Sequence, residues 1–267
     1  MIGAPARRLI GSLALLLTAF VFVRRASFSE PLGGLHILVP DDAGGLPIRL
    51  MLLSEEDGQD ILMERQEEII PTSDCCSSAA QWAMSWGGAD IAALCPDAAA
   101  SLVEKDPRYF IVGAFLYNSD VLVTRSENSS SKKAVMQNRG YQRDLLADRI
   151  ASADIVPMLP AGIVYALEKG FIGGGVMDAL MSWEVRGEKK PLATSGDVST
   201  YVLVASKEFA SSPAFDAFVL RFDRAIDELS TYEGLKNAVF SYAGLQWSKE
   251  DAELWKKLRI RFQKISR

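Results

Sequence analysis

The sequence predicts an α/β protein of two lobes with a ligand cleft between them. From Leu35 onward, short apolar runs alternate with amphipathic stretches, which is typical of βαβ units with a mainly parallel sheet. The polar stretch Ser126–Lys133 (SENSSSKK) interrupts this series, and a second series of the same kind follows it. A later run, Tyr201–Ala205, resembles Val121–Thr124 in length and apolarity, so we expect the chain to cross between the lobes twice.

Composition excludes several classes of protein. The chain has 267 residues, 49% of them hydrophobic and 24% charged, which is ordinary for a globular protein. A net charge of −5 provides no basic field for nucleic acid, so we expect no nucleic-acid partner. Three cysteines do not make a disulfide framework. A single histidine, His36, excludes a multi-histidine metal site and makes a histidine-centred triad implausible for this chain.

Residues 1–30 differ from the rest and predict a signal peptide or an N-terminal anchor. Two arginines precede the uncharged run Leu9–Val23, and Arg24 and Arg25 follow it. A basic start before an apolar run of this length is typical of a secretory signal, and the run is short for a membrane span. The arginines after it make a poor cleavage site, so retention as an anchor stays open. We therefore expect an extracytoplasmic protein, in the periplasm or on the outer face of the membrane.

The first lobe is expected to begin with residues 31–125. Its predicted strands are His36–Val39, Glu68–Ile70, Asp90–Leu94, Tyr109–Val112 and Asp120–Thr124, and its predicted helices are Leu46–Leu53, Ala79–Trp86 and Asp97–Glu104. This alternation of strand and helix predicts parallel pairing.

The second lobe is expected to span residues 126–195, and residues 196–267 return to the first lobe. The second series comprises strands at Ala134–Gln137, Ile155–Met158 and Gly175–Met177 and helices at Tyr141–Arg149 and Ala161–Lys169, with Gly170 as a left-handed cap. We predict that Val121–Thr124 and Tyr201–Ala205 pair in the first lobe. Helices at Pro213–Leu229 and Ser248–Ile265 follow, the second capped by Ser248 and Asp251.

Candidate ligand-binding residues follow the predicted strands, because ligands of open α/β sheets bind beyond the carboxyl ends of the strands. Asp41 and Asp42 follow the first strand and favour a ligand with a cationic or hydroxyl part; an acidic turn that caps the next helix is the alternative. In the first lobe, the candidates after the next two strands are Ser73, Cys75, Cys76, Ser77, Cys95 and Pro96.

The three cysteines are the sharpest of these candidates. Cys75, Cys76 and Cys95 would lie at the same edge of the sheet if their strands are neighbours. They could then form a disulfide, a thiol clamp on the ligand or a soft-metal site, since thiolates suit Zn or Cu(I). The alternative is that Cys95 is a small core residue and the other two form a turn.

Further candidates lie between the lobes and after the strands of the second lobe. They are Asn118 and Ser119, which could bind a polar ligand or form a strand kink, and Arg139, Tyr141 and Asp178. Arg139 could pair with an anion or be exposed to solvent. The run Gly173–Gly175 lacks the spacing and the lysine of a phosphate-binding loop, so no nucleotide or other cofactor is expected.

Five segments carry a resemblance to a known family. Segments of ABC-transporter substrate-binding proteins resemble Trp82–Ala100 (WAMSWGGADIAALCPDAAA), Lys133–Arg143 (KAVMQNRGYQR), Tyr165–Gly170 (YALEKG), Gly174–Asp178 (GGVMD) and Thr200–Phe218, which is similar to their return strand and following helix. The nearest group takes up sulfonates, nitrate and thiamine-pyrimidine precursors, and there is a fainter resemblance to a selenoprotein-associated subgroup. The family implies a type II periplasmic-binding fold, a small-molecule solute and a membrane permease as partner.

The resemblance implies solute capture for import without catalysis, by a chain that we expect to be monomeric. Two other functions stay open. The first is a cysteine-dependent enzyme on the same frame, as in thiamine-pyrimidine synthases, although one histidine and an export signal argue against it. The second is a sensory ligand-binding module held by an uncleaved anchor. The thiols would add a preference for a sulfur-, selenium- or metal-containing solute.

Overall fold

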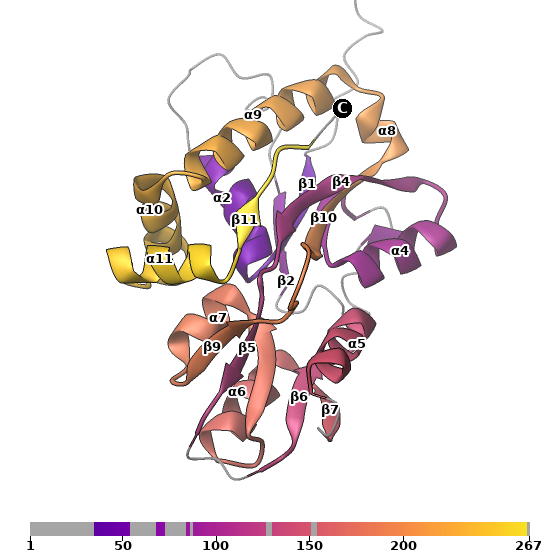
Figure 1. Ribbon diagram of the computed structural model, residues 1–267. Coiled ribbons are helices and arrows are strands. Elements are labelled where there is room, and N and C mark those ends of the chain that lie inside the picture. The colour runs from indigo at the N-terminus through magenta and orange to yellow at the C-terminus, as the bar shows by residue number, and fades with distance from the viewer. Residues whose placement is uncertain are drawn as a thin grey trace, which may run out of the picture. The chain divides into compact units, whose positions relative to one another are not determined.

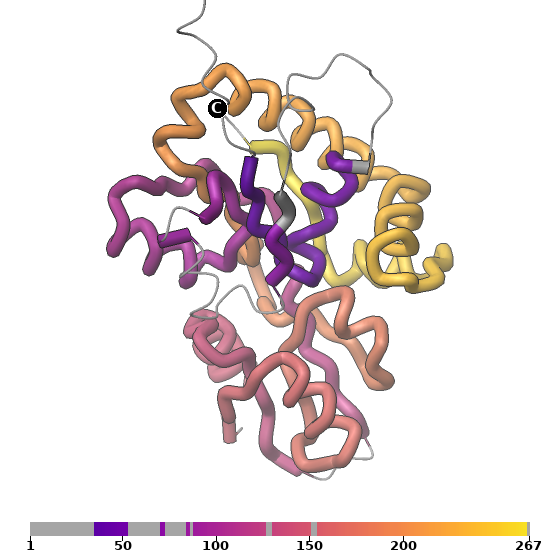
Figure 2. Tube along the Cα trace, turned by 180° about the vertical axis from the view of Figure 1, so that it is seen from behind, coloured from indigo at the N-terminus to yellow at the C-terminus, as the bar shows by residue number. Residues whose placement is uncertain are grey.

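Two β-sheets form the centres of two lobes, and helices pack around each of them (Figure 1; Figure 2 shows the reverse side). The computed structural model describes residues 35–53, 68–72, 84–85, 88–126, 130–150 and 154–265. These residues all belong to one compact unit, Leu35–Arg267.

The first lobe has a six-stranded sheet in the order β11-β4-β10-β3-β1-β2. Its strands are β1 (His36–Pro40), β2 (Glu68–Thr72), β3 (Ile91–Leu94), β4 (Tyr109–Tyr117), β10 (Ser199–Ser206) and β11 (Arg261–Phe262). β1 pairs in parallel with β2 and β3, whereas β10 pairs antiparallel with β3 and β4. Strand β1, which lies between β2 and β3, is fully buried at Ile37, Leu38 and Val39, as expected for a parallel strand covered on both faces.

Helices complete the first lobe and supply much of its core. They are η1 (Ala43–Gly45), α2 (Leu46–Leu53), α4 (Pro96–Lys105), α8 (Lys207–Ala210), α9 (Pro213–Leu229), α10 (Tyr232–Ala243) and α11 (Lys249–Lys257). The amphipathic helix α9 buries Phe218 and Phe222, and the Phe222 ring meets Phe115 of β4 edge-on at 5.2 Å. Aromatic contacts of this kind fix how a helix sits on its sheet.

The second lobe has a five-stranded sheet in the order β7-β6-β8-β5-β9. Its elements are β5 (Asp120–Thr124), β6 (Lys133–Met136), α5 (Gly140–Arg149), β7 (Ile155–Met158), α6 (Pro160–Glu168), β8 (Gly174–Asp178), α7 (Ala179–Glu184) and β9 (Glu188–Pro191). β6 pairs in parallel with β7 and β8, and β5 pairs antiparallel with β8 and β9.

Both sheets repeat one arrangement: a parallel trio is followed by a strand that runs antiparallel to it. The trio β2-β1-β3 continues into β10 and β4, and the trio β7-β6-β8 continues into β5 and β9. The chain passes from β4 to β5 and returns from β9 to β10, which gives the two predicted crossings. The candidate residues that follow β1, β3, β6 and β8 thus share the carboxyl ends of the strands.

Asn118 and Ser119 form the first crossing and are tied to the second. Asn118 adopts φ 60°, and its side-chain amide donates to Asp197 Oδ1 at 2.8 Å and to the Arg259 carbonyl at 2.9 Å. The Ser119 hydroxyl lies 2.9 Å from Thr200 Oγ1. The alternative of a strand kink therefore fits both residues, because their polar groups bond the first crossing to residues at the second.

Most predicted elements agree with the structure, and two predictions are wrong. Val121–Thr124 does not pair with Tyr201–Ala205: β5 lies in the second sheet, whereas β10 lies in the first. The chain thus crosses before Asp120, although we expected residues up to 125 in the first lobe. The helix predicted at Ser248–Ile265 ends at Lys257, since Arg259 turns with φ 62° and the chain then forms β11. Most of the helix predicted at Ala79–Trp86 lies outside the described residues.

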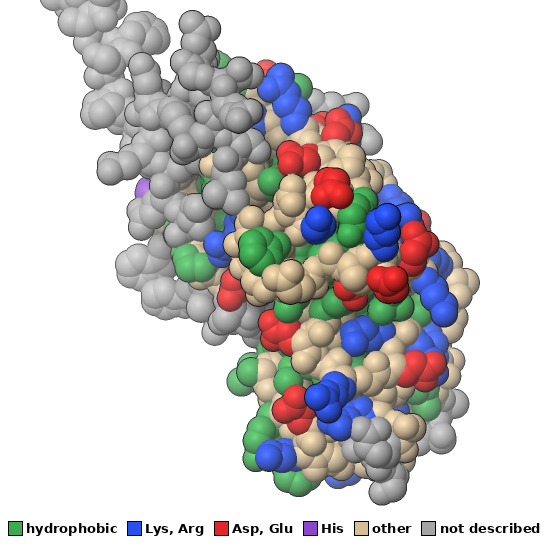
Figure 3. Space-filling model, turned by 90° about the vertical axis from the view of Figure 1, so that its left-hand side faces the viewer, with side chains coloured by type: hydrophobic (Ala, Val, Ile, Leu, Met, Phe, Trp, Pro, Cys, Tyr) green, Lys and Arg blue, Asp and Glu red, His purple; other side chains and the backbone are tan. Residues whose placement is uncertain are grey.

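The surface and the terminus bear on localisation. Charged side chains of both signs are mixed over the face shown in Figure 3, in keeping with the absence of a basic field from the sequence. In the described part of the chain, no helix combines the length and apolarity needed to span a membrane. The predicted signal or anchor, residues 1–30, lies outside the described residues, so it stays a prediction.

Candidate functional site

Polar side chains from both lobes meet where the parallel strands end. Asp42 follows β1 in the first lobe. In the second lobe, Arg139 follows β6, and Asp178 is the last residue of β8. Asp120 begins β5 directly opposite Asp178 in the antiparallel register, so the two carboxyl groups lie on the same side of neighbouring strands. We call this place the lobe boundary.

Arg139 is the centre of the lobe boundary. Its side chain is almost fully buried, and Nη1 donates to Asp120 Oδ1 at 2.9 Å. Its Nη2 donates to the Tyr201 hydroxyl at 2.7 Å, and the guanidinium carbon lies 5.3 Å from the Tyr201 ring centre. Asn138 directs the chain inward with φ 65°, so the residue that precedes α5 is buried. The alternative that the Arg139 side chain is exposed to solvent is therefore excluded.

Asp42 and Tyr201 extend these contacts into the first lobe. The Tyr201 hydroxyl donates to Asp42 Oδ2, while Asp42 Oδ1 accepts from the Gly44 amide at 2.9 Å and so caps η1. Arg139 Nη2 lies 4.0 Å from Asp42 Oδ2. Gly44 packs against Tyr201 so closely that an added Cβ would lie 2.5 Å from its ring. Asp42 therefore caps η1, as the alternative interpretation predicted, and it also lies near Arg139 of the second lobe.

Tyr141 completes what we call the Arg139 network: Asp42, Tyr201, Arg139, Asp120 and Tyr141. Its hydroxyl donates to Asp120 Oδ2 at 2.5 Å. Desolvation, followed by the charge of Asp120, raises the pKa of the Tyr141 phenol well above its usual range. The phenol therefore stays protonated at neutral pH and remains a donor to the carboxylate.

Asp178 lies beside this network and is only partly satisfied. Its Oδ1 accepts from Leu180 N at 2.9 Å, which caps α7, and from Ala43 N of the first lobe at 3.1 Å. Its Oδ2 is buried and has no hydrogen-bond partner. Burial raises the pKa of Asp178 to about 7, the Asp120 charge adds to the rise, and the two amides and Arg139 oppose it.

Two further contacts join the lobes. The Gly140 amide donates to Asp97 Oδ2 of α4 at 2.7 Å. On another side, Trp183 of α7 donates from Nε1 to Asp251 of α11 at 2.9 Å. The Trp183 ring lies 5.0 Å from Trp247 and 5.8 Å from Trp255, and we call these three the tryptophan cluster.

The remaining predicted residues of the first lobe divide into two groups. Asp41 is exposed and accepts from Tyr242 at 2.8 Å, away from the Arg139 network. Cys95 is fully buried and Pro96 begins α4, so the core reading of Cys95 fits the structure. Ser73, Cys75, Cys76 and Ser77 lie outside the described residues. No group of three metal-binding side chains occurs in the part of the chain that is described, and the thiol site stays a prediction.

The sequence reading missed Asp120, Tyr201 and Asp97 as site residues. Asp120 begins β5, Asp97 lies in the first turn of α4, and Tyr201 is the third residue of β10. Tyr201 offered the clearest signal, because a buried tyrosine hydroxyl needs a hydrogen-bond partner. Its partners come from Asp42 and Arg139, and only the folded structure brings these together.

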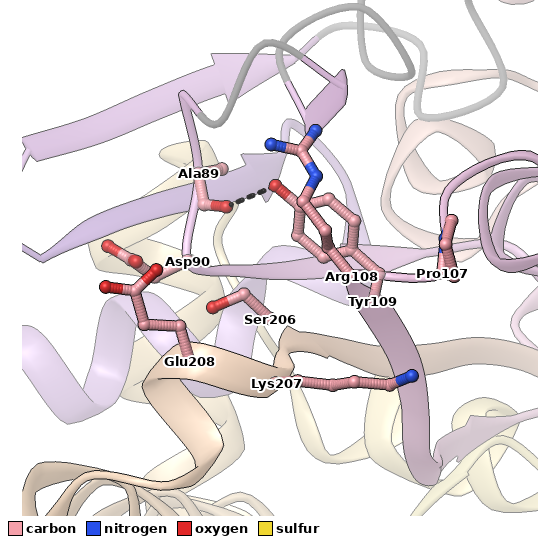
Figure 4. A pocket seen from close by; sticks show the side chains of 8 residues that line it. All are labelled: Ala89, Asp90, Pro107, Arg108, Tyr109, Ser206, Lys207 and Glu208. Atoms are coloured by element: carbon pink, nitrogen blue, oxygen red, sulfur yellow. Dashed lines mark hydrogen bonds between the residues drawn. The ribbon is translucent and has the colours of Figure 1, made fainter.

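A hollow of about 370 Å³ lies on the first lobe among residues outside the Arg139 network (Figure 4). Arg108 and Tyr109 line it at the start of β4, together with Asp90, which precedes β3. The Arg108 guanidinium donates to Asp106 at 2.6 Å, and the Tyr109 hydroxyl lies 2.6 Å from the Met84 carbonyl and 3.1 Å from that of Ala89. These contacts tie strand ends together, so the hollow has a structural explanation.

Some solved structures with a similar fold are ligand-binding proteins. The periplasmic aliphatic sulphonate binding protein SsuA from Escherichia coli shares 13% identity over 86% of this chain and 85% of its own, with a TM-score of 0.63. This chain has the periplasmic-binding-protein fold. The zinc-bound ligand-binding component of an ABC-type import system from Staphylococcus aureus has 13% identity over 87% and 86% of the chains, with a TM-score of 0.66.

A third solved structure with a similar fold is that of an ABC transporter from Parabacteroides distasonis, 12% identical over 86% of each chain with a TM-score of 0.66. At such low identity, the likeness confirms the predicted two-lobed fold and leaves the subgroup a prediction. No protein-family model matches the chain, and no curated protein sequence does either.

Proposed function

We propose that this chain is the extracytoplasmic substrate-binding component of an ABC importer. It captures a small polar solute at the lobe boundary and presents it to a membrane permease. The observation that carries this proposal is the Arg139 network: buried, hydrogen-bonded groups of two lobes face each other where the strands of both sheets end. Ligands of open α/β sheets bind at that place.

Few contacts need to change for a solute to enter. At the lobe boundary, Arg139 with Tyr201, Ala43 with Asp178, and Gly140 with Asp97 link the lobes through hydrogen bonds. Polar solutes can replace such bonds one for one, so the exchange of these three hydrogen bonds costs little net energy. The two crossings, at Asn118–Ser119 and at residues 192–198, provide the hinges.

The thiols belong to this proposal as a finer part. β2 ends at Thr72, which is in register with Pro40 at the end of β1, and residues 73–77 follow it directly in the sequence. We propose that Cys75 and Cys76 contact the solute, which would favour a sulfur- or selenium-containing molecule or a soft metal.

The test is native mass spectrometry of the full chain purified from its own cells, with and without a reductant. A retained small molecule supports capture, and its loss from a Cys75→Ser/Cys76→Ser variant supports the thiol contact. A Cys95→Ser variant tests the third candidate thiol separately, since this buried cysteine lies at the start of α4. Retention by both variants removes the thiols from the proposal.

Solution scattering then tests closure. The released molecule, added back to solute-free protein, should make the chain more compact. If no molecule is retained and none of the solutes screened alters the scattering, the binding function is rejected. Sequencing of the mature N-terminus distinguishes a free binding protein from an anchored one.

A further inference from the structure

The charge at the lobe boundary indicates which class of solute fits there. Three carboxyl groups, those of Asp42, Asp120 and Asp178, meet there from both lobes. The one cation that the described residues bring to them is Arg139, which is already bonded to Asp120 at 2.9 Å. The site therefore has an excess of negative charge when all three carboxyl groups are ionised.

Asp178 carries the local evidence that one positive group is missing. It is 1% exposed, its Oδ1 accepts two amide hydrogens, and its Oδ2 has no partner. A buried carboxylate oxygen without a donor is costly, and a proton or a cation can remove that cost. Asp120, directly opposite on β5, adds a repulsion of like charges.

An anionic solute would meet the opposite situation. Its oxygens would need donors, but the Arg139 guanidinium already donates to Asp120 and to Tyr201. The hydroxyls of Tyr201 and Tyr141 donate to Asp42 and Asp120. At Asp178 the unsatisfied atom is an acceptor, the carboxyl oxygen Oδ2, and an anionic solute offers it no hydrogen.

We propose that the solute carries an ammonium or guanidinium group, which donates to Asp178 Oδ2 and lies between Asp178 and Asp120. This inference rests on the proposed function and narrows it, since it separates the chain from a sulfonate-binding protein of the same fold. The positive group replaces the proton that Asp178 otherwise holds, so binding releases a proton.

The groups that face Asp178 decide the pH dependence. They are Asp120 from β5, Arg139 before α5, and the amides of Ala43 and Leu180. The pKa of Asp178 is raised to about 7, and a bound cation lowers it. As the pH is raised toward about 7, the affinity for a cation therefore increases by up to about tenfold per pH unit. Above pH ~7 the affinity no longer changes with pH.

The first experiment uses two probes of the same size and opposite charge, propylammonium and propanesulfonate, with the full chain at constant ionic strength. We expect propylammonium to raise the unfolding temperature, and to do so more at about pH 8 than at about pH 6. Asp178→Asn should abolish this shift. Asp144→Asn, on the exposed face of α5, should keep it.

Three results overturn the inference. They are stabilisation by propanesulfonate instead of propylammonium, a propylammonium shift that persists in Asp178→Asn, and no shift with propylammonium at all. Electrophoresis of any molecule retained from the protein's own cells gives an independent answer. An anion there rejects the cationic class while the binding function stands, whereas a chain that binds no solute in any screen rejects the function itself.

Discussion

The two lobes are joined by contacts of opposite character. The Arg139 network consists of charged and phenolic groups, and each bond in it has a defined geometry. The tryptophan cluster joins α7 of one lobe to the C-terminal helices of the other through apolar ring faces and one hydrogen bond. The first contact depends on charge and protonation, and the second depends mainly on buried area.

This difference gives the two contacts different roles in solute binding. Charged hydrogen bonds can be exchanged for bonds to a solute, so the network is suited to a site that opens and refills. Aromatic contacts have no such replacement in water, and separating them exposes apolar surface. The tryptophan cluster should therefore hold α7 against the first lobe under conditions that disrupt the Arg139 network.

Arg139→Met removes the charged contact and should have the largest effect. It leaves the Asp120 carboxylate buried beside Asp178 without its guanidinium, and breaking a buried ion pair on one side costs about 3–5 kcal/mol. Urea unfolding measures the loss. Arg143→Met, at an exposed position of α5, which Arg139 precedes, is the control and should change stability little. A loss equal to that of the control would contradict the central role of Arg139.

Trp183→Ala tests the aromatic contact. The change removes two ring contacts and the hydrogen bond to Asp251, and we expect a loss of about 3 kcal/mol in the free energy of unfolding. Because the contact is mainly apolar, the loss should be the same at low and high salt. Phe240→Ala serves as the control, since that ring is 53% exposed.

The sequence predicted the fold well, because local patterns encode it. The short continuous apolar run of His36–Val39 is typical of a buried parallel strand, and α9 places its buried residues at the period of a helix, and both elements form as expected. The position of β5 could not be predicted from its own residues. A short apolar strand fits either sheet, and the crossing at Asn118 decides which sheet it joins.

The site was predictable in part for a related reason. Strand ends identified Asp42, Arg139 and Asp178, because residues that follow parallel strands share one edge. The partners of Arg139 were missed, since Asp120 and Tyr201 lie at the start of strands that run antiparallel to those trios. Their position at the same edge follows from topology, which the residues alone do not disclose.

Asp178→Asn tests whether the contacts at the lobe boundary make the stability of the chain depend on pH. The folded pKa of about 7 lies above the ordinary value of 3.8, so the folded state binds the proton more tightly. This stabilisation is complete below pH ~4 and is lost as the pH rises to about 7. Between about pH 5 and pH 8 the native chain should lose about 2 kcal/mol more than Asp178→Asn. The free energy of unfolding is measured against pH for both variants, with Asp144→Asn as the reference. If it depends on pH in the same way in Asp178→Asn and in Asp144→Asn, the pKa of Asp178 is not raised.

Ser248→Ala should have the smallest effect, and it tests whether the tryptophan cluster depends on the helix that carries part of it. Ser248 caps α11 by accepting from the Asp251 amide at 3.1 Å, and Asp251 accepts in return from the Ser248 amide at 2.9 Å. Loss of such a cap costs about 1 kcal/mol. Asp251 also holds Trp183, so part of the loss should disappear in a Trp183→Ala background. A double-mutant cycle measures this coupling: full additivity would mean that the cap and the aromatic contact are independent, and that only buried area joins α7 to α11.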